Sequence, residues 1–184
     1  MSLLRPAVLC AALALLGARH HPPPTIFDLG DAVGARPPEL TLTATDGTPI
    51  AFRALAGKPT FVFLFAQWCH PCKLAEPLVL RDYARYGDRV RFIGVDVLDD
   101  AKKARDAVAA AKYPFPVIVF GEAELDKIIS EDERAGRGHK YEVPTDYLLD
   151  AEGRVRTISH GLAVNEHGDP VDVLPSDLEK LGIP

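Results

Sequence analysis

Two cysteines separated by two residues, Cys69 and Cys72, are the most chemically informative feature of this sequence. They are the ends of a Cys-His-Pro-Cys run that comes directly after the apolar segment 60–66. A buried strand leading into a helix would place Cys69 at the helix N-terminus, where partial positive charge and unpaired N–H groups favour a thiolate. Such a pair can close a disulfide with itself or open one in a partner. The spacing therefore indicates a redox site.

The residues around the pair have expected roles. Cys69 is expected to be exposed at the first helical turn and to attack a partner disulfide, and Cys72, one turn deeper, is expected to resolve the mixed disulfide. Pro71 suits a first helical turn. His70 has two possible roles. As a cation it would stabilise the Cys69 thiolate, and His70→Gly would then lower the reduction potential. Otherwise it is a solvated loop residue. Trp68 either shields the site and contacts partner peptides or packs beside the strand.

The beginning of the chain predicts export. Segment 1–18 has one early cation, Arg5, and an apolar stretch shorter than the roughly 20 residues that span a bilayer. We expect a signal peptide, with an uncleaved membrane anchor as the alternative, and a periplasmic or exported location. Of the three cysteines, Cys10 lies in this segment. Removal of the segment would leave only Cys69 and Cys72, which are too few for a structural disulfide framework. The net charge of −5 argues against a nucleic-acid partner.

The remaining 166 or so residues divide into a linker and one domain. Residues 19–36, rich in proline and glycine, are the predicted linker, and 37–184 are the predicted domain. In the domain, strands and helices alternate and a hairpin leads, which indicates an α/β sandwich with a mixed sheet. The expected strands are a hairpin over 38–52 and single strands at 60–66, 90–95, 117–120, 145–149 and 154–159. The expected helices run from the cysteines to Gly87, from Asp99 or Asp100 to Lys112, and near 123–131. A last helix is expected to begin at Ser176, with Glu179 completing a capping box.

Several landmarks together resemble the thioredoxin superfamily. They are the Trp-Cys-x-Pro-Cys sequence after a buried strand, Lys73 behind it, and Pro77 five residues past the second cysteine. Val143-Pro144, before an apolar strand, is similar to the cis-proline loop that lies against the dithiol in that superfamily. The resemblance implies a cis bond at Pro144 and a Val143 backbone that faces the substrate.

The hairpin and the extra helix and strand over 101–120 are similar to the TlpA and ResA branch of that superfamily. The resemblance covers about residues 36–181. It implies a thioredoxin-like three-layer sandwich with an N-terminal β-hairpin and an exported, often membrane-tethered thiol–disulfide oxidoreductase. Its disulfide is the redox group, so no cofactor and no metal are expected.

Two positions depart from the family pattern. Phe63 stands where thioredoxins carry a buried aspartate, and Ala75 stands where the TlpA branch often carries a glutamate. Glu76 follows one place later, rotated by about 100° on a helix. Glu76 and Asp146 are the remaining candidates for a proton acceptor, although for each the sequence favours a solvated surface carboxylate.

The leading hypothesis is a monomeric disulfide oxidoreductase that reduces protein disulfides and receives electrons from a membrane partner; cytochrome c maturation is one role of the family. A peroxidase is the alternative enzyme, although the chain has Ala66-Gln67-Trp68-Cys69 in place of the Thr-x-x-Cys motif. A binding module that holds a partner through the charged insert 122–140 is the non-enzyme alternative. A zinc site would need a second ligand pair, which the sequence lacks.

Overall fold

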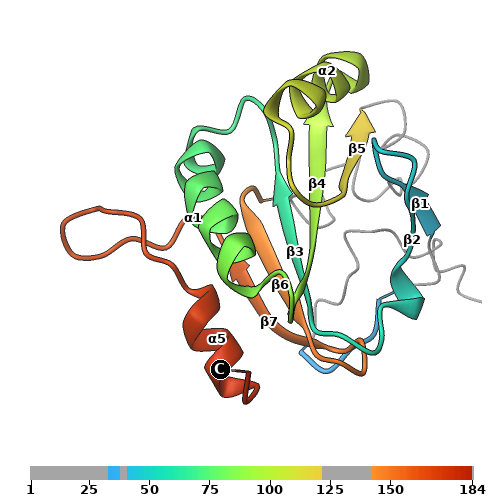
Figure 1. The fold of residues 1–184 in the computed structure, drawn as a ribbon. Helices are drawn as coiled ribbons and strands as arrows, with labels where there is room; N and C mark the ends of the chain where they lie inside the picture. The colour runs from blue at the N-terminus through green and yellow to red at the C-terminus, as the bar shows by residue number, and fades with distance from the viewer. Residues whose placement is uncertain (1–32, 38–40, 122–141, 184) are drawn as a thin grey trace, which may run out of the picture.

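The computed structural model describes residues 33–37, 41–121 and 142–183 (Figure 1). Segment 1–18, the expected helix near 123–131 and the insert 122–140 lie outside the described residues. The main sheet has the order β5-β4-β3-β6-β7, with β3, β4 and β5 parallel and β6 and β7 antiparallel to their neighbours. Its strands are β3 (Thr60–Phe65), β4 (Arg91–Asp99), β5 (Val117–Gly121), β6 (Thr145–Leu149) and β7 (Val155–His160).

Strand β3 lies at the centre of the sheet because both of its faces are apolar. All six of its residues are buried, and it pairs in parallel with β4 and antiparallel with β6. Phe61, Phe63 and Phe65 face one core cluster, whereas Val62 and Leu64 face the other. The predicted central strand is thus confirmed, and it carries the redox sequence at its carboxyl end.

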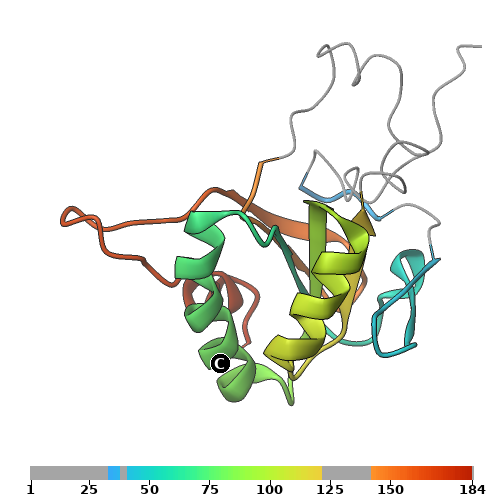
Figure 2. The same ribbon diagram turned by 90° about the horizontal axis from the view of Figure 1, so that it is seen from above.

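Within the described ranges, three helices cover one face of the sheet: α1 (His70–Tyr86), α2 (Ala101–Ala111) and α5 (Leu174–Lys180). Val79 of α1, Val108 of α2 and Leu178 of α5 are buried in the same core cluster as the β3 phenylalanines. Figure 2 shows α1 and α2 lying side by side along the sheet. The end of α1 and the start of α2 agree with the sequence prediction. Helix α1 stops before Gly87. Helix α2 is capped at its N-terminus by the Asp100 carboxylate, which accepts the Lys103 N–H.

The opposite face is covered, in the described part of the chain, by the predicted hairpin. Strands β1 (Thr41–Thr43) and β2 (Pro49–Ala51) pair antiparallel and lead into the 3₁₀-helix η2 (Phe52–Ala54). Ile50 and Phe52 are buried in the second core cluster. Helices, sheet and hairpin form three layers, in agreement with the predicted fold class.

Two boundaries differ by two or more residues from the sequence prediction. Strand β4 continues to Asp99 instead of ending at residue 95. Helix α5 begins at Leu174, not at Ser176, and no capping box forms. Burial of Leu174 draws the start of the helix toward the core, and Pro175 fits the first turn, where its missing N–H costs nothing. The Leu174 N–H is accepted by the Asp172 carboxylate.

The last residues of the predicted linker contact the domain. The Gly34 N–H donates to the Val155 carbonyl, and the Val155 N–H donates to the Ala35 carbonyl. Among the described residues, no helix is long and apolar enough to span a bilayer.

Candidate redox site

The turn from β3 into α1 carries a disulfide between Cys69 and Cys72, with an S–S distance of 2.05 Å. Cys69 is the residue that caps α1, and its Sγ accepts the Cys72 backbone N–H at an N···S distance of 3.1 Å. The sulfur therefore lies at the positive end of a helix of 17 residues. This placement follows from the apolar strand, the turn at 66–68 and Pro71 in the first helical turn.

The expected exposure of Cys69 is wrong for this oxidised form. Cys69 is 2% exposed and Cys72 is 3% exposed. Cys69 packs into the core cluster that includes Phe65, and Val143 packs against that cluster from the outside. In this oxidised form, a thiolate that attacks the disulfide has to approach it closely over this surface.

The predicted cis-proline loop lies beside the disulfide. The Val143–Pro144 peptide bond is cis, as predicted. The Val143 carbonyl oxygen is 3.6 Å from Cys69 Sγ. Thr145 anchors the loop, because its hydroxyl donates to the Glu142 carbonyl at 2.7 Å. Backbone groups of this loop are therefore next to the sulfur that a substrate would approach.

The outer surface around the disulfide is formed by the remaining predicted residues. Trp68 is 60% exposed, and His70 and Pro71 are also exposed. An exposed indole next to the disulfide favours contact with a partner over packing beside the strand. The roles of these three residues in substrate contact and redox tuning remain predictions.

Glu76 faces away from solvent, toward the segment that follows α2. The hydroxyl of Tyr113 hydrogen-bonds with the Glu76 carboxylate, and burial together with this carboxylate raises the pKa of Tyr113. The Tyr113 ring contacts Phe65, with 5.8 Å between ring centroids. Glu76 is thus half-buried and engaged, which differs from a solvated surface residue. Its role as a proton acceptor stays a prediction.

A buried carboxylate that the sequence interpretation missed lies on the same side of the site. Asp96, at 0% exposure, is paired in register with Phe65 and accepts a hydrogen bond from Gln67 Nε2 at 2.6 Å. The signal was a lone charge inside the apolar strand Val95-Asp96-Val97. The Gln67–Asp96 bond ties the turn before Cys69 to β4.

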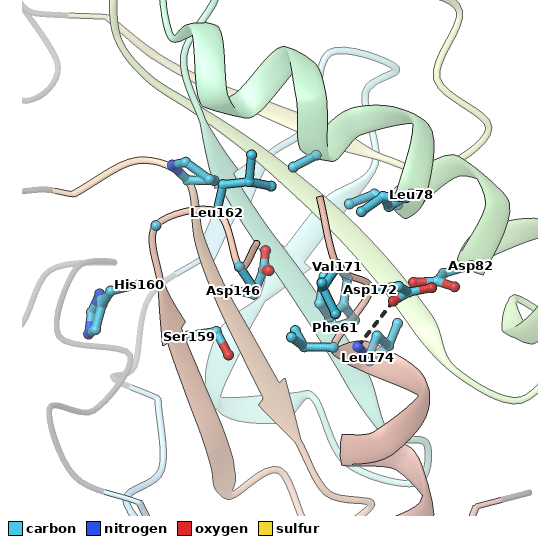
Figure 3. Close-up of a pocket in the computed structure, with 16 residues that line it drawn as sticks. Phe61, Leu78, Asp82, Asp146, Ser159, His160, Leu162, Val171, Asp172 and Leu174 are labelled. Atoms are coloured by element: carbon cyan, nitrogen blue, oxygen red, sulfur yellow. Dashed lines mark hydrogen bonds between the residues drawn. The ribbon is translucent and has the colours of Figure 1, made fainter. Parts of the chain in front are cut away.

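A cavity of about 290 Å³ lies beside the cis-proline, between α1, the ends of β6 and β7, and the segment 161–174 (Figure 3). Pro144 and Asp146 both line it. Burial raises the pKa of Asp146 to about 7, with the carboxylates of Asp172 and Asp177 adding to the shift. The expectation of a solvated Asp146 is therefore wrong, because β7 and α5 enclose its side of the sheet.

Asp146 lies directly opposite Phe63 in the β3–β6 ladder. Residues directly opposite in an antiparallel pair place their side chains on the same face. A carboxylate from β6 thus lies next to the position where thioredoxins carry their buried aspartate.

At the far end of the cavity, Asp82 and Asp172 form a carboxyl pair (Figure 3). Burial raises the pKa of Asp82 to about 7, and the charge and hydrogen bond of Asp172 contribute to the increase. Arg81 forms an ion pair with Asp172. Asp82, 3% exposed, lies on the buried stripe of α1 with Ala75 and Val79. A charged residue at an apolar position of that stripe was the sequence signal for this pair.

No group of three histidine, cysteine or acidic residues in the described ranges is arranged to hold a metal ion.

Comparisons with known proteins agree with this architecture. ResA of Bacillus cereus, a thiol-disulfide oxidoreductase, is 27% identical over 124 residues, which cover 67% of this chain and 66% of ResA. The chain thus spans slightly less than two thirds of that relative. The thiol:disulfide interchange protein CycY of Rhizobium leguminosarum is 26% identical over 159 residues, 78% of each chain.

A solved structure shares the fold. The thioredoxin domain of a thiol-disulfide oxidoreductase from Bacteroides vulgatus superposes with a TM-score of 0.62 at 18% identity, covering 83% of this chain and 99% of that one. The fold is therefore thioredoxin-like, as the sequence resemblance implies. Residues 33–158 match the model of the AhpC/TSA family. The match includes the disulfide, the cis-proline and the whole five-stranded sheet except the last two residues of β7. The chain therefore belongs to the AhpC/TSA family.

Proposed function

We propose that this protein is a thiol–disulfide oxidoreductase that reduces disulfides of protein substrates. The observation that carries the proposal is the Cys69–Cys72 disulfide, capping α1 with the Val143 carbonyl 3.6 Å from Cys69 Sγ. A helix N-terminus favours the thiolate, and an exposed Trp68 with a neighbouring backbone carbonyl suits an approaching polypeptide. The names of ResA and CycY support the same activity.

The reaction exchanges two electrons. In the reduced protein, the Cys69 thiolate attacks one sulfur of the substrate disulfide, a mixed disulfide forms, and the other substrate sulfur leaves as a thiolate that takes up a proton. Cys72 then loses its proton and attacks Cys69 Sγ, which re-forms the Cys69–Cys72 disulfide and releases the second substrate thiol. The substrate is reduced, and the protein is oxidised to the form seen here. An external dithiol reductant must return it to the reduced form.

The direction and place of the reaction belong to the same proposal. An export signal over 1–18 would deliver the domain to an oxidising compartment, where disulfides persist. A reductant there needs electrons from across the membrane, so we place the dithiol donor in the membrane. Measurement of the reduction potential of the Cys69–Cys72 couple checks the direction, because a potential above that of the substrates would make the protein an oxidant.

The test is insulin reduction with a dithiol donor. The wild type should reduce insulin, Cys69→Ser should be inactive, and Cys72→Ser should accumulate a mixed disulfide that mass spectrometry detects. Cys10→Ser is the matched control and should retain activity, because Cys10 precedes the domain. Wild-type levels of reduction by Cys69→Ser would refute the proposal. Consumption of peroxide without insulin reduction would favour the peroxidase alternative.

A further inference from the structure

The cavity beside Pro144 adjoins the loop that lies against the disulfide. Pro144 lines the cavity, and its neighbour Val143 has its carbonyl oxygen 3.6 Å from Cys69 Sγ. A polypeptide linked to Cys69 by a disulfide extends by about 3.3 Å per residue. Residues within a few positions of the substrate cysteine therefore reach the cavity. The cavity opens to the surface on this side, since His160, Gly161 and Val171 line it and are exposed.

The walls and the floor of the cavity differ in chemistry. The walls are apolar side chains from α1, β3 and the segment after β7: Phe61, Leu78, Val79, Leu162, Val171 and Leu174. The floor carries the Asp146 carboxyl, which Figure 3 shows pointing into the space between these walls. Long basic side chains combine an apolar stem with a cationic head. The stem matches the apolar walls of the cavity, and the head matches the Asp146 carboxyl.

Asp146 is the carboxyl in this cavity that lacks a partner. Its Oδ1 is closed off from solvent and has no hydrogen-bond partner among the residues that the structure describes. The neighbouring acids are engaged: Asp172 pairs with Arg81 and interacts with Asp82, and Asp177 pairs with Lys180. A half-buried carboxylate without a partner is costly in these apolar surroundings, and a cation bound beside the carboxylate would lower that cost.

We propose that this cavity is a subsite for a lysine or arginine side chain of the substrate polypeptide, with the Asp146 carboxylate as the group that binds its cationic head. The inference rests on the proposed function, because the substrate chain reaches the cavity from Cys69. The cavity is several times larger than the roughly 30 Å³ that one water occupies. It therefore has room for a side chain, and a cavity filled by water alone is the outcome that the experiment must distinguish.

The experiment uses disulfide-linked peptide dimers in which each peptide has one cysteine. A single lysine is placed at each of the three positions on either side of the cysteine, and each lysine peptide is matched by one with norleucine, which keeps the aliphatic stem and lacks the charge. The rate constant for reduction by the wild type should be about tenfold higher for lysine than for norleucine at one or two positions. In Asp146→Asn this ratio should fall to about one.

The control variant is Asp88→Asn, which removes the same charge from a side chain that is 77% exposed. It should keep the wild-type ratio of lysine to norleucine rates. A ratio near one at every position in the wild type, which a water-filled cavity would give, overturns the inference. So does an equal preference for lysine at all six positions, which reflects net charge, or a preference that survives in Asp146→Asn.

Failure of the proposed function is separable from failure of the subsite. If the wild type reduces no peptide, the oxidoreductase proposal fails. The subsite is then judged by titrating cysteine-free lysine and norleucine peptides into the oxidised protein and following the ¹³C resonance of the Asp146 carboxyl. Tighter binding of the lysine peptide, with a shift of that resonance, supports the subsite, and equal affinity of the two peptides overturns it.

Discussion

Replacement of Asp146 by asparagine should make the protein more stable at alkaline pH. The pKa of Asp146 is about 7 in the folded protein, against 3.8 for a freely solvated aspartate, because the carboxyl is enclosed between β6, β7 and α5. The folded state thus holds this proton more tightly than the unfolded state. The contribution of Asp146 to stability is therefore fully present below pH 4 and is lost as the pH rises to about 7.

The size of the effect follows from the same values. One pKa unit corresponds to about 1.4 kcal/mol, so a change from 3.8 to about 7 gives an ionisation cost on the order of 4 kcal/mol. This figure is an upper bound, because the cavity admits solvent on one side. Asparagine has a similar shape and cannot ionise, so Asp146→Asn avoids this cost at every pH.

The assay is urea unfolding of the oxidised wild type and variant at intervals from pH 4 to pH 9. The free energy of unfolding of Asp146→Asn, minus that of the wild type, should rise by several kcal/mol between pH 4 and pH 8 and then level off. The matched variant Asp88→Asn, at the surface, should differ from the wild type by a nearly constant amount. A constant difference for Asp146→Asn as well would refute the reasoning, because it would mean that this carboxyl ionises as easily when folded as when unfolded.

Three further outcomes are expected. The free energy of unfolding of Asp82→Asn, minus that of the wild type, should also be larger at pH 8 than at pH 4 when measured with urea. The reason is that the pKa of Asp82 is about 7 and that an amide can donate to the carboxylate beside it. Gly153→Ala should lower the free energy of unfolding by about 1–3 kcal/mol, since Gly153 has a φ of 73° and a Cβ there would lie 2.9 Å from the Leu55 carbonyl oxygen; an unchanged urea midpoint would contradict this. His70→Gly should lower the reduction potential of the dithiol, and a glutathione titration identical to that of the wild type would remove His70 from redox tuning.

Local sequence patterns were sufficient to predict the elements that hold the dithiol. A continuous apolar run predicted β3, and Asp100 and Gly87 predicted where helices begin and end. These signals work because each depends on neighbours within one or two turns of the chain. The cis-proline loop at Pro144 was predicted only through the family resemblance, since a cis bond is a minority state.

The burial of the acidic residues could not be predicted in the same way. Whether Asp146 is solvated depends on β7, α5 and the segment 161–174 closing over one face of β6, and these contacts join distant parts of the chain. The pKa of Asp82 is likewise raised by burial, and Asp172, ninety residues later, adds to the increase. Val143, 74 residues after Cys69, likewise packs against the core cluster that contains Cys69. The sequence alone predicted the pair of cysteines that forms the disulfide, and long-range packing decided the surroundings of that pair.

Part of the cavity wall comes from a stretch of the chain that follows the elements around the disulfide. The family match ends at residue 158, and Leu162, Val171 and Leu174 lie beyond it. A change at Val171, which is exposed, can reshape the cavity without altering the core cluster that contains both cysteines, whereas Leu174 belongs to that cluster. The domain thus has a part in which substrate preference can evolve with little risk to electron transfer. Exchange of residues 161–171 between relatives, which leaves the buried Leu174 and Leu178 in place, is accordingly a direct route to new selectivity.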